Sequence, residues 1–62
     1  MQTAATIIET SSNEFFAVRD ITGIDHAWLG IRVKLVKGEW KVKAKAREIL
    51  VRKAASRVVQ TA

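Results

Sequence analysis

The sequence predicts a small α+β domain, in which an antiparallel β-sheet is packed on its apolar face by a C-terminal helix. Two observations lead to this fold class. Apolar and basic residues alternate through most of 31–47, which is the period of a half-buried strand. Beyond Arg47 the apolar residues recur with the 3.6-residue period of a helix. The chain has 62 residues and no linker rich in Gly, Ser or Pro, so residues 1–62 are expected to form one small domain.

The N-terminal third allows two interpretations. Residues 14–21 are rich in aromatic and β-branched residues, which favours a strand. The Ser-Ser-Asn segment before them would then be a turn that follows a first strand over 3–9. The alternative is a short helix over 12–22, because Ser11 and Glu14 have the spacing of a capping box. The sequence leaves both possibilities open.

The middle of the chain predicts a β-hairpin with strands over 27–36 and 39–46. Lys37-Gly38 suits a two-residue turn, since Gly readily adopts the positive φ that such turns require. This register places Lys34 opposite Lys41. One face of the hairpin is then apolar and consists of Ile31, Val33, Leu35, Trp40, Val42, Ala44 and Ala46. The other face is basic and consists of Arg32, Lys34, Lys41, Lys43, Lys45 and Arg47.

The C-terminal segment is predicted to be an α-helix over 47–60. Its apolar stripe consists of Leu50, Val51, Ala54, Ala55 and Val58. Glu48 would lie in the first turn, where the helix dipole favours negative charge. This helix is expected to cover the apolar face of the hairpin.

The length of the chain predicts self-association. Domains below roughly 70–80 residues usually need a disulfide, a metal or a partner subunit. The chain has no Cys and a single His, His26, so we expect no disulfide, no metal site within one copy and no cofactor. A homo-oligomer is therefore expected, with an interface formed by Trp28, Trp40, Leu50, Val51, Ala54 and Val58.

The chain is expected to bind a partner and not to be an enzyme. Asp25 and His26 are adjacent, and neighbouring side chains of an extended segment point to opposite sides, so they need not form a catalytic pair. No nucleophile motif accompanies them. No apolar run approaches the roughly 20 residues of a membrane span. The lack of Cys and of a recognisable signal peptide is compatible with a cytoplasmic location.

The charge distribution indicates an anionic partner. Residues 1–30 contain one basic residue against four acidic ones, whereas residues 31–62 contain ten against two. Like charges opposite each other destabilise a sheet, and an anionic partner would relieve that repulsion. We therefore predict a nucleic-acid-binding protein, regulatory or architectural, that contacts DNA or RNA mainly through phosphates. The predicted contacts are the six residues of the basic hairpin face, Arg32, Lys34, Lys41, Lys43, Lys45 and Arg47.

Two other interpretations remain. The chain could be a non-catalytic structural or adaptor subunit, with the basic half docked on an acidic protein surface or on the acidic half of another copy. The basic face could also be no more than solvated surface. Nucleic acid that copurifies with the protein, seen in the ratio of absorbance at 260 and 280 nm, would favour the first interpretation.

Overall fold

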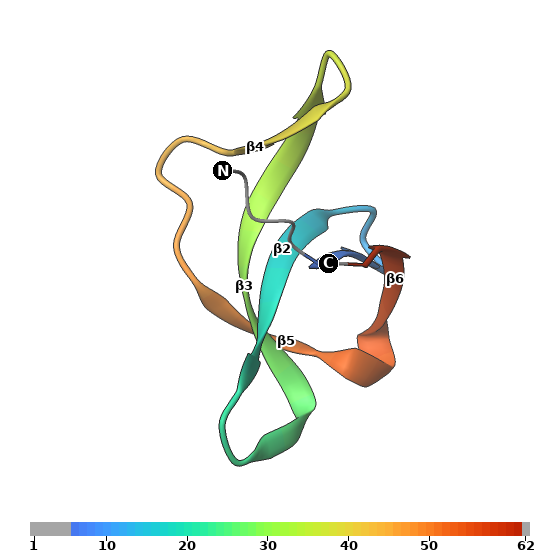
Figure 1. Cartoon of the computed structure of the whole chain (residues 1–62), viewed down its shortest axis with the longest axis vertical. Helices are drawn as coiled ribbons and strands as arrows, with labels where there is room; N and C mark the ends of the chain where they lie inside the picture. The colour runs from blue at the N-terminus through green and yellow to red at the C-terminus, as the bar shows by residue number, and fades with distance from the viewer. Residues whose placement is uncertain (1–5, 62) are drawn as a thin grey trace.

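The computed structural model describes residues 6–61, and in this range the chain is one antiparallel β-sheet (Figure 1). Its elements in chain order are β1 (Thr6–Thr10), β2 (Phe15–Ile21), β3 (Ile24–Val36), β4 (Glu39–Val42), β5 (Ile49–Arg52), the 3-10 turn η1 (Lys53–Ala55) and β6 (Ser56–Gln60). The strand order is β4-β3-β2-β1-β6, and β5 pairs with β3. No α-helix occurs within residues 6–61, so the predicted α+β class is wrong and the described chain is all-β.

The N-terminal third forms two strands. β2 confirms the strand interpretation of this segment, and the alternative helix over 12–22 is wrong. Phe16 and Val18 alternate with more exposed neighbours, as the period-two pattern requires. Asn13, with a φ of 61°, lies in the turn between β1 and β2, and Asn tolerates this left-handed conformation well. The first strand was predicted over 3–9; residues 3–5 lie outside the described chain.

The predicted hairpin is present, and its register is confirmed. Lys37-Gly38 forms the two-residue turn, with φ values of 52° and 81°, and Lys34 pairs with Lys41. The second strand, however, ends at Val42, so its predicted extension to residue 46 is wrong. A turn ends the strand: the amide of Ala46 donates to the carbonyl oxygen of Lys43 at 3.2 Å, and Lys45 has a φ of 63°.

The predicted C-terminal helix over 47–60 is also wrong. This segment consists of β5, the three-residue turn η1 and β6. Its β-branched residues, Ile49, Val51, Val58 and Val59, lie in the two strands, whereas the two adjacent alanines lie in the turn. The apparent helical stripe therefore combines residues from two strands and the turn that separates them.

The sheet curls around its core, because β5 and β6 lie at opposite edges and are joined only by η1. β5 pairs with β3, and β6 pairs with β1. Figure 1 shows this connection passing around the sheet from β3 to β1. The enclosed core cluster consists of Ile8, Phe16, Val18 and Val51, with Trp28 packed against it.

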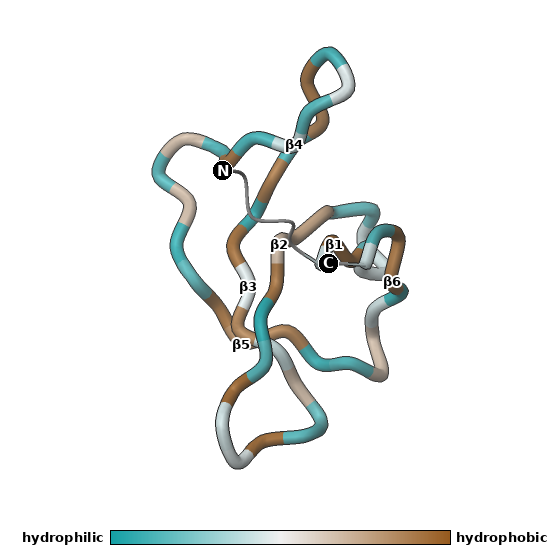
Figure 2. The backbone as a smooth tube through the Cα atoms, in the orientation of Figure 1, coloured by the Kyte–Doolittle hydropathy of each residue, from teal (hydrophilic) through white to brown (hydrophobic). Residues whose placement is uncertain are grey.

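The apolar face of the hairpin lies on the sheet surface opposite the basic side chains. Figure 2 shows the alternation of hydrophobic and hydrophilic residues along β3 and β4 that separates these two faces. The ring of Trp40 lies 5.1 Å from that of Phe15, and its Nε1 donates to Gln60 Oε1 at 3.1 Å. Leu35 and Val42 remain 59% and 56% exposed, since the helix expected to cover them is not formed.

Candidate nucleic-acid interface

Four of the six predicted contact residues share one face of the β3–β4 hairpin. Arg32 and Lys34 are two residues apart on β3, so they point to the same side of the sheet. Lys41 is the cross-strand partner of Lys34. The amide of Lys43 donates to the carbonyl oxygen of Arg32 at 3.1 Å, which continues the same register by one pair. All four side chains are exposed, and we call them the basic quartet.

Two members of the basic quartet have an acidic neighbour. The Nε of Arg32 lies 3.0 Å from a carboxylate oxygen of Glu14, and its guanidinium lies 5.6 Å from the centroid of the Phe16 ring. The ammonium of Lys41 lies 3.9 Å from a carboxylate oxygen of Glu39, at the limit of an ion pair. Lys34 and Lys43, the other two members, form no ion pair with any residue in 6–61. The quartet therefore keeps a net positive charge.

The remaining two predicted contacts lie outside the hairpin ladder. Lys45 and Arg47 belong to the connector over 43–48, which leads from the end of β4 to the start of β5. Both strands pair with β3, so the connector follows the same edge of the sheet. Lys45 and Arg47 are exposed and extend the positive surface beyond the quartet, but the strand register does not align them with it.

The ion pairs determine where the excess charge lies. All 11 basic and all 6 acidic side chains lie within residues 6–61, and five ion pairs join them. Of these pairs, all but Lys41–Glu39 connect the acidic first half of the chain to its basic second half. Among the described acidic residues, Asp25 alone is outside an ion pair. The described basic residues outside ion pairs are Lys34, Lys37, Lys43, Lys45, Arg47 and Arg52.

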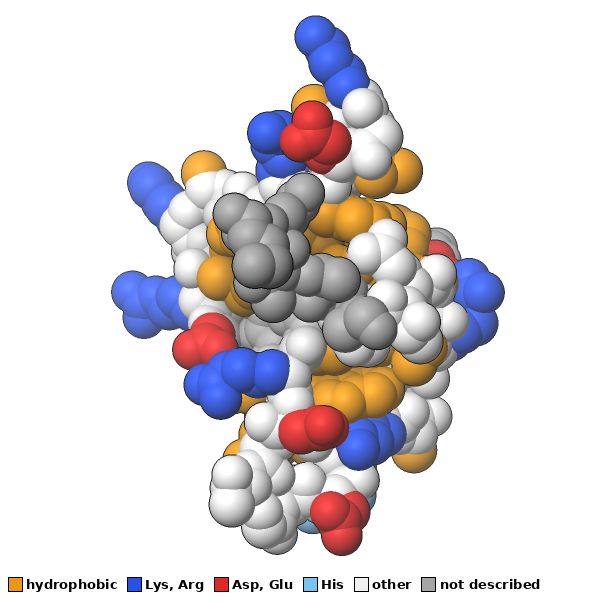
Figure 3. Space-filling view, viewed as in Figure 1, with side chains coloured by type: hydrophobic (Ala, Val, Ile, Leu, Met, Phe, Trp, Pro, Cys, Tyr) orange, Lys and Arg blue, Asp and Glu red, His pale blue; other side chains and the backbone are white. Residues whose placement is uncertain are grey.

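The unpaired basic residues gather at one end of the molecule. All except Arg52 belong to the hairpin or to the connector over 43–48. Figure 3 shows Lys and Arg side chains projecting from the hairpin tip and from the connector, with acidic side chains among them as well as at the opposite end, over the β2–β3 turn. The net charge of +5 is therefore strongly polarised along the molecule.

An open pocket of about 310 Å³ adjoins the basic quartet, and we call it the β5 pocket. It lies between the β1–β2 turn and strand β5. Apolar lining comes from Phe16 and Val51, which are 2% and 6% exposed, together with Ile49. Its charged lining consists of Arg32, its ion-pair partner Glu14, and Arg52. Arg32 therefore belongs both to the quartet and to the pocket.

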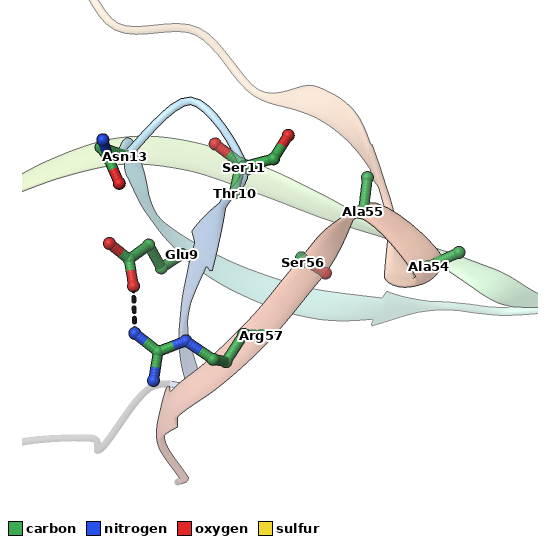
Figure 4. Close-up of a pocket in the computed structure, with 8 residues that line it drawn as sticks. All are labelled: Glu9, Thr10, Ser11, Asn13, Ala54, Ala55, Ser56 and Arg57. Carbon is green, nitrogen blue, oxygen red and sulfur yellow. Dashed lines mark hydrogen bonds and ion pairs between the residues drawn. The ribbon is translucent and has the colours of Figure 1, made fainter.

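A second open pocket of about 460 Å³, the β6 pocket, lies between the same turn and the segment formed by η1 and β6 (Figure 4). Its single cationic side chain is Arg57, which forms an ion pair with Glu9 across the pocket. Because this pair neutralises the charge, the β6 pocket is a poorer anion site than the β5 pocket, where Arg52 is outside any ion pair in the described chain.

The structure divides the six predicted interface residues into two groups. Val51 is a core residue, and Trp28 packs against the same core cluster with the ammonium of Lys53 at 5.2 Å from its ring centroid. Trp40 is partly buried. The exposed members are Leu50, Ala54 and Val58. These three are the members of the predicted interface that a partner can reach most easily.

Sequence reasoning identified the quartet and missed the β5 pocket. The alternation of Lys and Arg with apolar residues marked the basic face directly. Phe16 and Arg52 carry no such signal, because they reach the pocket from strands far apart in the sequence. Asp25 and His26 lie together at the exposed β2–β3 end, away from this pocket. Among residues 6–61 there is no cluster of three or more potential metal ligands.

No family model, curated protein sequence or solved structure matches this chain. Within the described residues, no helix has the length and apolar character needed to cross a membrane. The fold and the charges define a small all-β chain with one strongly basic end.

Proposed function

We propose that this protein is a non-catalytic nucleic-acid-binding protein that contacts phosphates through the basic quartet. The observation that carries the proposal is the location of the unpaired positive charge. Internal ion pairs engage most acidic side chains, and the charge that remains is concentrated on the hairpin and the connector. A surface of one sign attracts a polyanion and accelerates its association.

The chemistry of the basic quartet supports backbone contacts more than base readout within the quartet itself. Three of its members are lysines, which provide point charges without the planar fork that arginine presents to a guanine edge. Phosphate contacts orient a protein on nucleic acid but carry little sequence information. A two-stranded ribbon with exposed basic side chains also has dimensions that fit a major groove.

The alternative of head-to-tail assembly through opposite charges is weaker. It requires the acidic half of one copy to be available to the basic half of the next. In this chain Glu9, Glu14 and Asp20 are already in ion pairs with basic residues of the same chain. Docking of the basic end on an acidic surface of a different protein stays the rival hypothesis.

The salt dependence of duplex DNA binding tests the proposal. Each phosphate that is neutralised adds about −0.9 to the slope of log affinity against log salt, so four contacts give a slope of about −4. Replacing Lys41 and Lys43 with Ala should reduce the magnitude of this slope by about two and weaken all sequences alike. Fluorescence anisotropy of a labelled duplex at several salt concentrations measures both quantities.

A matched control removes the same charge elsewhere. Arg19→Ala combined with Lys53→Ala also removes two positive charges, but from ion pairs outside the hairpin. This control should leave the slope nearly unchanged. If both double variants reduce the slope equally, net charge alone causes binding and the quartet is not the site. If the wild type does not bind duplex or single-stranded DNA or RNA even at about 50 mM salt, the proposed function is refuted.

A further inference from the structure

We propose that the β5 pocket receives one unstacked base of a single-stranded nucleic acid whose phosphates lie along the basic quartet. This inference rests on the proposed function and adds a preference for single strands over duplexes. Four features of the pocket support it: its lining, its size, the membership of Arg32 in both the pocket and the quartet, and the positive charge of Arg52.

The pocket lining combines the two kinds of surface that bind a flat heterocycle. The accessible apolar surface comes from Ile49 and Leu50, which are 38% and 58% exposed, and the almost fully buried Phe16 and Val51 lie beneath it. The hydroxyl-bearing residues Ser11 and Ser12 lie in the turn that forms the opposite side. Small-molecule sites typically combine a mostly apolar lining with a few polar groups in this manner.

The open pocket has room for a single base. Its volume of about 310 Å³ is at the lower end of the range of about 300–1,000 Å³ that is typical of ligand pockets. A base that is stacked and paired within a duplex has its faces covered and its pairing edge engaged. Sequence recognition in RNA accordingly favours unstacked bases, which are held on aromatic rings or on arginine planes. A single-stranded segment offers such a base without the cost of breaking a pair.

Arg32 connects the pocket to the phosphate path. Its guanidinium lies over the Phe16 ring, with Nε held 3.0 Å from the Glu14 carboxylate, so the planar cation has a fixed position at the pocket. A guanidinium plane stacks well on aromatic groups, including bases. Lys34 follows two residues along the same face of β3, so a strand that places a base beside Arg32 has its next phosphates over the quartet.

Arg52 provides a second positive charge at the same pocket. It lines the pocket from β5, is exposed, and forms no ion pair with any described residue. The apolar floor alone would admit any flat apolar ligand. The additional cation favours a base that carries an adjacent phosphate, as each nucleotide in a strand does.

The test compares one labelled oligonucleotide as a single strand and as a duplex, at the same salt concentration, by fluorescence anisotropy. The wild type should bind the single strand more tightly. Ile49→Ser removes accessible apolar surface from the pocket without changing its charge and should reduce single-strand affinity about five-fold. Duplex affinity should be unchanged.

Val59→Ser is the matched control, because Val59 is a β-branched residue on β6 that is 37% exposed and lines neither of the two pockets. It should leave both affinities unchanged, and circular dichroism should give the wild-type spectrum for both variants. Equal wild-type affinity for the two forms, or an equal loss of both affinities in Ile49→Ser, overturns the pocket assignment while the phosphate-binding function stands. Absence of binding to either form refutes both proposals.

Discussion

Lys34 and Lys41 are directly opposite each other in the β3–β4 ladder, so two side chains of the same charge share one exposed face. Opposed like charges destabilise an antiparallel pair, whereas opposite charges contribute roughly 0.2–1 kcal/mol. The chain therefore holds an unfavourable pair at the centre of its proposed binding face. A substitution at this pair is therefore expected to change the stability of the fold and the affinity for nucleic acid in opposite directions.

Lys34→Glu should stabilise the fold and weaken nucleic-acid binding. The new carboxylate would face Lys41, and the free energy of unfolding should rise by about 0.5 kcal/mol in urea titrations at low salt. Anisotropy should show a large loss of DNA affinity. Lys37→Glu is the control, since it makes the same charge change in the turn, where no cross-strand cation faces it. A Lys34→Glu variant with unchanged or lower stability would contradict the expected repulsion.

The pair Val51→Ala and Leu50→Ala distinguishes the observed strand from the predicted helix. Val51 is 6% exposed and belongs to the core cluster, whereas Leu50 is 58% exposed. Val51→Ala should lower the free energy of unfolding by about 2 kcal/mol. Leu50→Ala should change it by less than about 0.5 kcal/mol. A helix with both residues on its buried stripe would instead give two comparable losses in urea denaturation.

Gly30→Ala should be destabilising because the position has no room for a side chain. A Cβ at Gly30 would lie 2.7 Å from Cγ1 of Val18 and 3.3 Å from Cβ of Phe16. Such overpacking typically costs about 1–3 kcal/mol. The expected result is a lower midpoint of thermal unfolding, with Asp25→Ala, at an exposed position, as the control. Wild-type stability of Gly30→Ala would show that the core between β2 and β3 is looser than the structure indicates.

Self-association stays a prediction, with a smaller set of contacts than the sequence indicated. Leu50 and Val58 are 58% and 45% exposed, and they are the large apolar members of the predicted interface that a partner can reach. Sedimentation equilibrium at micromolar concentration should give a mass above the 6.9 kDa of one chain. Replacing both residues with Ser should shift the mass toward that of the monomer. A folded wild-type monomer under these conditions refutes the prediction.

The parts of the fold that sequence reasoning predicted correctly have local causes. The β3–β4 register follows from strict alternation on both sides of Lys37-Gly38, because a shift by one residue would exchange the apolar and basic faces. Strand β2 follows from aromatic and β-branched residues around Phe16. In both cases the pattern and the turn chemistry lie within a few residues of each other.

The errors arise where structure depends on distant parts of the chain. Val51 and Val58 are seven residues apart, which is the spacing of two turns of a helix. Two strands joined by a tight turn give the same spacing, so the sequence pattern does not distinguish the two structures. Pairing of β5 with β3 and of β6 with β1 selects the strands, and no local pattern reveals those partners. The same limit applies to the site: the basic face was visible in the sequence, whereas the Glu14–Arg32 pair and the β5 pocket depend on the assembled sheet.

The pairing of β1 with β6 has a consequence for the order in which the chain folds. Ile8 lies opposite Val58, so the outer edge of β1, the first described strand, is paired with β6, the last. Contacts of such high sequence separation slow folding, because a long loop must close before they form. The hairpins β1–β2 and β2–β3 involve strands adjacent in sequence and are able to form early, whereas β1 keeps an unpaired edge until β6 reaches it. The sheet is therefore complete only after β6 has paired with β1.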